Sequence, residues 1–163
     1  MRPRCIFTAI NSWDSWDANK RKRHIEYLRA LESSDVLVIE SAFATNSDWC
    51  RAYQRYCKFK GEKQTDVAIA VEVSADCYAD SVDRIFLVSA DSDQIPLLSH
   101  LANRFREKRV LLVAPPKRLS QARDLGARAH AVLQLTKGRL FDHLFPHNVE
   151  SALTPLHYGQ GHI

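Results

Sequence analysis

Two aspartates, Asp91 and Asp93, stand one residue apart directly after the apolar segment Phe86-Leu87-Val88, in the stretch FLVSADSDQIPLL. Two carboxylates this close repel each other unless a cation or backbone donors lie between them. Carboxylate clusters with few other ligand types suit Mg²⁺ or Mn²⁺, which keep several waters and contact phosphate oxygens. The alternative is that one aspartate caps a helix that begins near Ile95, where its carboxylate accepts from free backbone amides. Taken alone, the DSD sequence favours capping.

A second acidic pair precedes the first, because EKQTDVAIAVEV places Glu62 and Asp66 four residues apart at the head of an amphipathic pattern. If the first turn there is helical, both carboxylates lie on one helix face. The preference of acidic residues for helix starts, together with solvated charge, would also explain this pair. With Asp91 and Asp93, the chain then offers four candidate oxygen ligands.

Short, nearly continuous apolar runs predict five strands, each buried on both faces. They span residues 4–10, 36–41, 84–90, 109–114 and 130–135. Helical patterns lie between them, at residues 18–32, 64–80, 95–107 and 120–127. Strands that alternate with helices predict an α/β fold with a parallel sheet covered on both faces.

In open α/β sheets, ligands bind beyond the carboxyl ends of the strands. Asp91 and Asp93 follow the predicted strand 84–90, and the loop APPKRLS puts Lys117 and Arg118 after strand 109–114. The pattern therefore predicts carboxylates and cations at one edge of the sheet. On the helix of residues 64–80, the predicted packing stripe consists of Val67, Ala70, Val71, Ser74, Ala75 and Tyr78.

Basic and aromatic residues allow two interpretations. The run NKRKRH, residues 19–24, lies at a predicted helix start and suits either a phosphate or a solvated basic face. Aromatic side chains that could stack on bases are Trp13, Trp16, Trp49, Tyr53 and Tyr56, but core or rim packing is expected for most of them. The formal net charge of +4 is compatible with a polyanionic partner and does not require one.

Several classes of protein have no support in this sequence. No apolar run approaches the roughly 18 residues of a membrane span, and the amino terminus lacks a signal-peptide pattern, so a cytoplasmic protein is expected. The four cysteines are irregularly spaced, which predicts reduced thiols. There is no GxSxG, GxxxxGK[ST] or HExxH motif of serine hydrolases, P-loop proteins or zinc proteases. At 163 residues the length suits one domain, predicted at 1–146, with a tail over 147–163.

The segment GEKQTDVAIAVEVSADCYADSVDRIFLVSADSDQIPLL resembles the NYN domain, a branch of the PIN-like nucleases. In that family a helix headed by E-K-x-T-D-V, an A-x-x-D spacer and a strand ending in S-G-D-S-D recur in this order. IFTAI is similar to the family's second strand, and RHIEYLRALESSDVLVIESAF to the following helix and third strand. KRVLLVAPPKRLSQARDLGARAHAVLQL is similar to the final strand, helix and strand, and LFP to the closing motif, so the resemblance covers about residues 4–146.

The resemblance implies a three-layer α/β/α PIN-like fold with a mostly parallel sheet, and a ribonuclease that depends on Mg²⁺ or Mn²⁺. The implied catalytic and metal-binding residues are Asp66, Asp91 and Asp93, with Glu62 as a further metal-site neighbour. The implied RNA contacts are Lys117, Arg118 and Ser89. The expected partner is single-stranded or structured RNA, and a homodimer is a further hypothesis.

Two departures from the family pattern bear on this interpretation. Ala90 replaces the glycine of S-G-D-S-D, which is tolerable if the backbone φ there is negative. The family's first strand, which ends in D-G-x-N and supplies one more aspartate, has no counterpart here, so we expect a true start upstream of Met1 or a gene fragment. The alternative hypothesis is a catalytically silent module that binds RNA or protein; a HAD-like phosphotransferase with a DxD motif fits less well, because its nucleophilic acid belongs to a first strand.

Overall fold

The computed structural model describes residues 4–10, 17 and 19–145. The chain forms two compact units, each considered by itself. Of the described residues, Gln64–Leu144 form the C-terminal unit, and those from Arg4 to Lys63 together with Phe145 form the N-terminal unit. The predicted tail, residues 147–163, and Trp13 and Trp16 lie outside the described residues.

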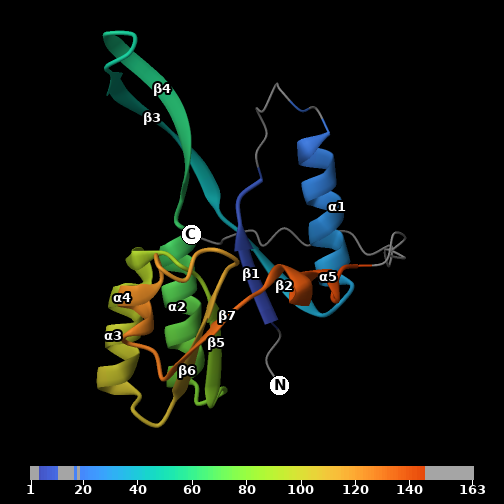
Figure 1. The fold of residues 1–163 in the computed structure, drawn as a ribbon, viewed down its shortest axis with the longest axis vertical. Coiled ribbons are helices and arrows are strands. Elements are labelled where there is room, and N and C mark those ends of the chain that lie inside the picture. Colours follow the sequence, from blue (N-terminus) through green and yellow to red (C-terminus); the bar gives the residue numbers. More distant parts are fainter. Residues whose placement is uncertain (1–3, 11–16, 18, 146–163) are drawn as a thin grey trace. The chain divides into compact units, whose positions relative to one another are not determined.

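The sheet of the C-terminal unit is parallel, in the order β5-β6-β7 (Figure 1). Its strands are β5 (Arg84–Val88), β6 (Arg109–Ala114) and β7 (Ala131–Gln134). The accompanying helices are α2 (Thr65–Tyr78), the 3₁₀ helix η1 (Ser92–Gln94), α3 (Ile95–Arg104), α4 (Arg123–Gly126) and α5 (Lys137–Phe141). The three strands and α2, α3 and α4 confirm the elements predicted from apolar runs and helical periodicity, whereas α5 was not predicted.

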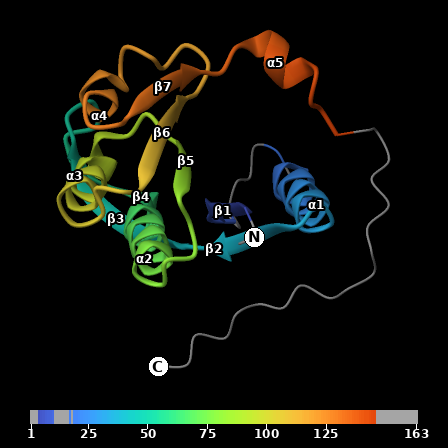
Figure 2. The ribbon, with the colours of Figure 1, turned by 90° about the horizontal axis from the view of Figure 1, so that it is seen from below.

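Helices α2, α3 and α4 lie on one face of this sheet (Figure 2). Their contact buries four leucines almost completely: Leu98, Leu101, Leu112 and Leu125. Each such leucine stabilises the fold by about 1.5–3 kcal/mol relative to an exposed one. The core therefore fixes the ends of β5 and β6 to the helices that follow them.

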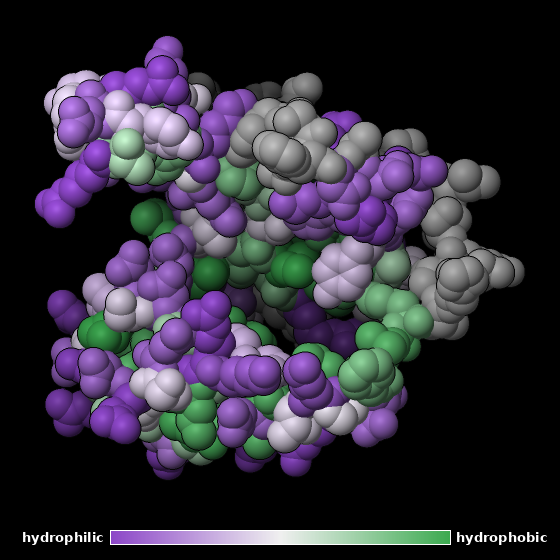
Figure 3. Space-filling model, turned by 45° about the horizontal axis from the view of Figure 1, so that its top comes forward, coloured by the Kyte–Doolittle hydropathy of each residue, from purple (hydrophilic) through white to green (hydrophobic). Residues whose placement is uncertain are grey.

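The prediction that the strands are buried on both faces agrees with β6, where four of six residues are buried, but it is wrong for β5 and β7. On β5 the buried Leu87 alternates with Phe86 and Val88, which are both 61% exposed, because successive strand residues point to opposite faces. All four residues of β7 are exposed. Hydrophobic side chains accordingly reach the surface in Figure 3. The three-layer arrangement thus remains a prediction, while the mixed α/β fold with parallel sheets is confirmed.

Helix α2 packs through a different stripe from the predicted one. Ile69, Ala70 and Val73 pack against the core, and Cys77 is buried, whereas Val67, Val71 and Tyr78 are exposed. The helix is apolar on two sides, so its periodicity did not distinguish the stripe that faces the sheet.

The N-terminal unit contains a parallel pair and one helix. Strand β1 (Arg4–Thr8) pairs with β2 (Val36–Glu40), and α1 (Lys20–Glu32) packs beside β2 with Leu28 and Ala30 buried. These three elements confirm predictions to within two residues at each end.

A long antiparallel hairpin follows β2 and was not predicted. Strands β3 (Ala42–Cys50) and β4 (Arg55–Lys63) pair from Ala42↔Lys63 to Cys50↔Arg55, with a loop over residues 51–54 (Figure 1). Gln54 adopts a left-handed φ of 48° in that loop. We call residues 42–63 the ribbon. Among the described residues of both units, no helix is long and apolar enough to cross a membrane.

Candidate functional site

The parallel pairing of β5 with β6 places their carboxyl ends at the same edge of the sheet. Ser89, Asp91 and Asp93 follow β5 there, and Lys117 and Arg118 follow β6. The topology therefore confirms that acids and cations follow neighbouring strands at one edge. That they bind metal or RNA is not shown by this placement.

Asp91 caps η1. Its Oδ1 accepts from the backbone N–H of Asp93 at 3.0 Å, and its own N–H donates to Ser89 Oγ at 3.0 Å. The capping interpretation is thus confirmed, and it occupies one carboxylate oxygen of Asp91. Both Asp91 and Asp93 are exposed, so solvent and ions reach their carboxylates. Ala90 is not among the residues of positive φ, which explains why alanine is tolerated in place of glycine.

Asp66 lies in the first turn of α2 and is half-buried. Its Oδ1 accepts a hydrogen bond from Gln94 Nε2 at 2.7 Å. A carboxylate in a first helical turn is stabilised by the helix dipole, and a bond to an ionised acceptor is stronger than a neutral one. Asp66 is therefore attached to the segment that carries Asp93.

Gln94 is the residue that sequence analysis missed. It is 1% exposed, and its Oε1 is buried with no hydrogen-bond partner among the described residues. Rotating the amide would bring Oε1 against the Asp66 carboxylate, so the donor orientation is the favourable one. From sequence alone, a glutamine that follows an acidic turn is expected at the surface. No local pattern indicates that Gln94 is buried.

Glu62 does not share a helix face with Asp66. It lies on β4 opposite Phe43, in the N-terminal unit, whereas α2 begins only at Thr65. The condition for the shared face, a helical first turn that includes Glu62, is not met. A metal role for Glu62 is untested.

The cations lie in the loop after β6. Lys117 is exposed and has a φ of 64°, and the guanidinium of Arg118 donates to Gln121 Oε1 at 2.5 Å. The loop is closed by a bond from Arg118 N to the Pro115 carbonyl at 3.1 Å. Lys117 is thus a solvated charge, and Arg118 is oriented by its neighbour.

The donor types at this edge match a hard divalent cation, since Asp66, Asp91 and Asp93 offer only oxygen. Within residues 4–10, 17 and 19–145, however, no three His, Cys, Asp or Glu side chains are grouped so as to hold a metal ion. Mg²⁺ is commonly held by one or two carboxylates and several waters. Asp91 and Asp93 provide the one or two carboxylates that such a site requires. A site in which three acids bind the metal remains a prediction.

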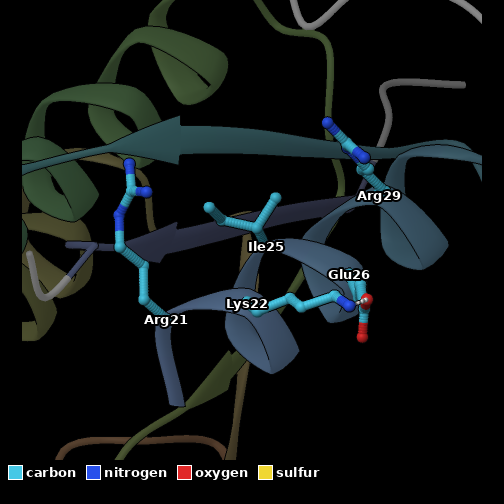
Figure 4. Close-up of a pocket in the computed structure, with 5 residues that line it drawn as sticks. All are labelled: Arg21, Lys22, Ile25, Glu26 and Arg29. Atoms are coloured by element: carbon cyan, nitrogen blue, oxygen red, sulfur yellow. Dashed lines mark ion pairs between the residues drawn. The ribbon is translucent and has the colours of Figure 1, made fainter. Parts of the chain in front are cut away.

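Two shallow hollows are lined by residues other than these acids. The larger, about 340 Å³, is lined by one face of α1: Arg21, Lys22, Ile25, Glu26 and Arg29. Figure 4 shows Lys22 directed toward Glu26, with which it forms an ion pair at 3.9 Å, while Arg21 and Arg29 lie apart. These charges are well solvated, which favours the solvated-face interpretation of the basic run.

The smaller hollow, about 240 Å³, is lined by Ala102, Arg106, Arg128, Ala129 and His130. His130 immediately precedes β7, so this hollow adjoins the amino ends of the strands. Neither hollow is lined by Asp66, Asp91 or Asp93. We place the candidate site at the acids because an exposed metal site that approaches a polymer needs no deep cavity.

Comparison with known proteins identifies the family. The family model of the NYN domain matches residues 3–134, which include most of both units. A crystal structure of a protein of unknown function from Vibrio parahaemolyticus RIMD 2210633 is similar at a TM-score of 0.50, with 18% identity over 80% of this chain and 68% of that one. This likeness concerns the fold alone, and a search of curated proteins finds no match. Since the family model accounts for most of the sequence, the chain belongs to the NYN domain family.

Proposed function

We propose that this protein is a divalent-metal-dependent ribonuclease that hydrolyses phosphodiester bonds of RNA. The observation that carries the proposal is the position of Asp91 and Asp93 immediately past β5 in a NYN domain. Asp66 supports it, because the bond to Gln94 joins this third carboxylate to the same segment.

In this proposal Asp91, Asp93 and Asp66 hold Mg²⁺ or Mn²⁺, with Glu62 as a further neighbour. When bound, the metal would activate water and stabilise charge on the leaving oxygen. Lys117 would position the RNA backbone electrostatically.

Two further side chains would contact the phosphate. The Arg118 guanidinium is oriented by Gln121. Ser89 Oγ already accepts from Asp91 N, which leaves its hydroxyl proton available for a phosphate oxygen.

The same proposal includes a PIN-like three-layer domain over residues 1–146. Among the described strands, β5 pairs only with β6. A further strand along the other edge of β5, with an aspartate at its carboxyl end, would add a carboxylate to the site. Phe86 and Val88 point to the exposed face of the sheet, which the second helix layer of a three-layer domain would cover.

A second candidate is a module that binds RNA or protein without cleaving it. It is favoured by one observation, that the described residues contain no group of three potential metal ligands. Both candidates use the same fold, so only a measurement of chemistry separates them.

The test is cleavage of end-labelled single-stranded RNA with Mn²⁺ or Mg²⁺ and with a chelator. The Asp91→Asn variant is compared with Asp124→Asn, an exposed aspartate on α4 that serves as the matched control. Metal-dependent cleavage that is lost in the first variant and kept in the second supports the ribonuclease. Cleavage that survives Asp91→Asn contradicts it, and absence of cleavage by folded wild-type protein favours the binding module.

A further inference from the structure

The two faces of the ribbon differ in exposure. Because residues alternate, one face carries eight side chains, and all of them are exposed except the half-buried Phe43. Glu62 lies opposite Phe43 on this face. We call the other six the ribbon face: Thr45, Ser47, Trp49, Tyr56, Lys58 and Lys60. On the opposite face Asn46 lies close to Gly61, and the thiols of Cys50 and Cys57 are hydrogen-bonded. This second face is mixed, because Asp48, Arg55 and Phe59 on it are exposed whereas Asn46, Cys50 and Cys57 are half-buried.

Two aromatic rings stand together at the loop end of the ribbon face. Trp49 and Tyr56 occupy directly opposite positions, with ring centroids 5.4 Å apart and planes at 76°. They remain 50% and 71% exposed. In a perpendicular pair one ring directs its edge at the other, so flat ring surface stays open to a further stacking partner. Neither ring is therefore buried in a core; the expectation of core or rim packing applied to most of the aromatic residues and not to all of them.

Positive charge continues along the same face. Lys58 and Lys60 follow Tyr56 at steps of two residues, about 7 Å each in an antiparallel strand. Residues 42–63 contain five basic and two acidic side chains, a net charge of +3, compared with +4 for the whole chain. At the start of β4, the Arg55 guanidinium lies 5.6 Å from the centroid of the ring of Tyr53 in the loop. A polyanion is the partner that this charge complements.

We propose that the ribbon face binds single-stranded RNA, with bases stacked on Trp49 and Tyr56 and the backbone along Lys58 and Lys60. Stacking platforms beside cations are how proteins bind single strands without reading their sequence. The inference rests on the proposed function, since it names a surface that would hold the substrate outside the carboxylate site. It concerns binding alone, however, so it can be tested without metal and without cleavage.

Other occupants fit this face less well. A second copy in a two-fold symmetric contact centred on Lys58 and Lys60 would bring their like charges together, which is unfavourable across an interface. An RNA duplex would hide its base faces from the aromatic rings and has a major groove too narrow for side chains to read. The exposed ring faces of Trp49 and Tyr56 therefore suit unstacked bases.

The experiment uses the full chain with Asp91→Asn and a chelator, so that no RNA is cut. Trp13→Phe and Trp16→Phe leave Trp49 as the single tryptophan of the protein. A single-stranded RNA of mixed sequence, about 12 nucleotides long, is titrated against the emission of Trp49. Fluorescence anisotropy of the labelled RNA gives the Kd in parallel. We expect quenching of Trp49 that saturates at the same RNA concentration as the anisotropy.

Single substitutions in this Asp91→Asn, Trp13→Phe, Trp16→Phe protein, which we call the parent, test each part of the ribbon face. We expect Trp49→Ala to weaken binding about tenfold, or about 1.4 kcal/mol, and Trp49→Phe to retain most of the affinity. Phe141→Ala, at an exposed aromatic residue of α5, is the matched control and should bind as the parent does. Thermal unfolding of each variant verifies that it folds, and the Phe replacement separates stacking from support of the hairpin.

Salt dependence tests the lysines. Lys58→Gln should reduce the slope of log K against log salt by about 0.7, whereas Lys137→Gln on α5 should leave it unchanged. Equal affinities for parent, Trp49→Ala and Phe141→Ala would overturn the proposal, as would tighter binding of duplex than of single-stranded RNA. Binding that depends on Trp49 in a protein that never cleaves RNA would support the ribbon face and contradict the ribonuclease.

Discussion

Replacing Gln94 by leucine separates its role at the acidic site from its role in the core. Gln94 is 1% exposed, donates to Asp66 at 2.7 Å, and carries an unpartnered Oε1 within the described part of the chain. Leucine has a similar volume and no polar atoms. The variant therefore removes the support of the Asp66 carboxylate while it keeps the packing.

The expected change in the free energy of unfolding follows from two opposing effects. Loss of a hydrogen bond to a charged acceptor costs about 1.5–3 kcal/mol, and relief of a buried unsatisfied oxygen returns about 1–3 kcal/mol. The free energy of unfolding of Gln94→Leu should thus fall by no more than about 2 kcal/mol. Under the proposed function, release of Asp66 should lower kcat/KM about 10²-fold, as expected when a catalytic group is displaced by about 1 Å.

Urea unfolding and metal-dependent RNA cleavage measure the two quantities. Gln94→Glu provides the opposite perturbation, because it places a second buried carboxylate against Asp66 and should destabilise the fold at neutral pH more than Gln94→Leu does. Gln134→Leu, at an exposed glutamine of β7, is the matched control and should preserve both stability and activity. A Gln94→Leu protein that loses more than about 3 kcal/mol yet cleaves normally would refute the reasoning.

Three further predictions concern the core, an ion pair and a thiol pair. Leu112→Ala should lower the free energy of unfolding by about 2–5 kcal/mol in urea titrations, since Leu112 is fully buried; a smaller loss would contradict that packing. The hydrogen bond from buried Lys108 lowers the pKa of Asp80, so this pair should stabilise the fold above the ordinary carboxyl pKa, about 4, and lose that contribution as pH falls through the lowered value. Thermal melts should show a weaker acid dependence in Asp80→Asn than in the wild type. A backbone hydrogen bond from the loop lowers the pKa of Cys50, and desolvation raises that of Cys57, so alkylation followed by mass spectrometry should label Cys50 first; faster labelling of Cys57 would contradict this order.

Much of the local structure could be read from short-range patterns. Continuous apolar runs located β1, β2, β5, β6 and β7, because β-branched and aromatic residues favour strands even where, as on β5, one face is exposed. The DSD sequence placed Asp91 and Asp93 at a strand end, and parallel pairing then brought Lys117 to the same edge. Such conclusions need only the periodicity of the sequence and the rule that the carboxyl ends of parallel strands lie at the same edge of a sheet.

The ribbon could not be read in this way. Its sequence, AFATNSDWCRAYQRYCKFKGEK, has neither a continuous apolar run nor a regular alternation, since neither face is fully buried. Cross-strand pairs such as Trp49↔Tyr56 hold it, and they are separated along the chain. Glu62 consequently lies on β4 and not in a helical turn with Asp66, which the sequence had left open.

Local sequence determines the strands, the helices and the acids at a strand end, since each depends on neighbours a few residues away. Tertiary structure alone decided three other features: which stripe of α2 packs, that Gln94 is buried against Asp66, and that Trp49 and Tyr56 are paired on an exposed face. Each of these depends on a contact between residues distant in the chain, whose free energy no local pattern encodes.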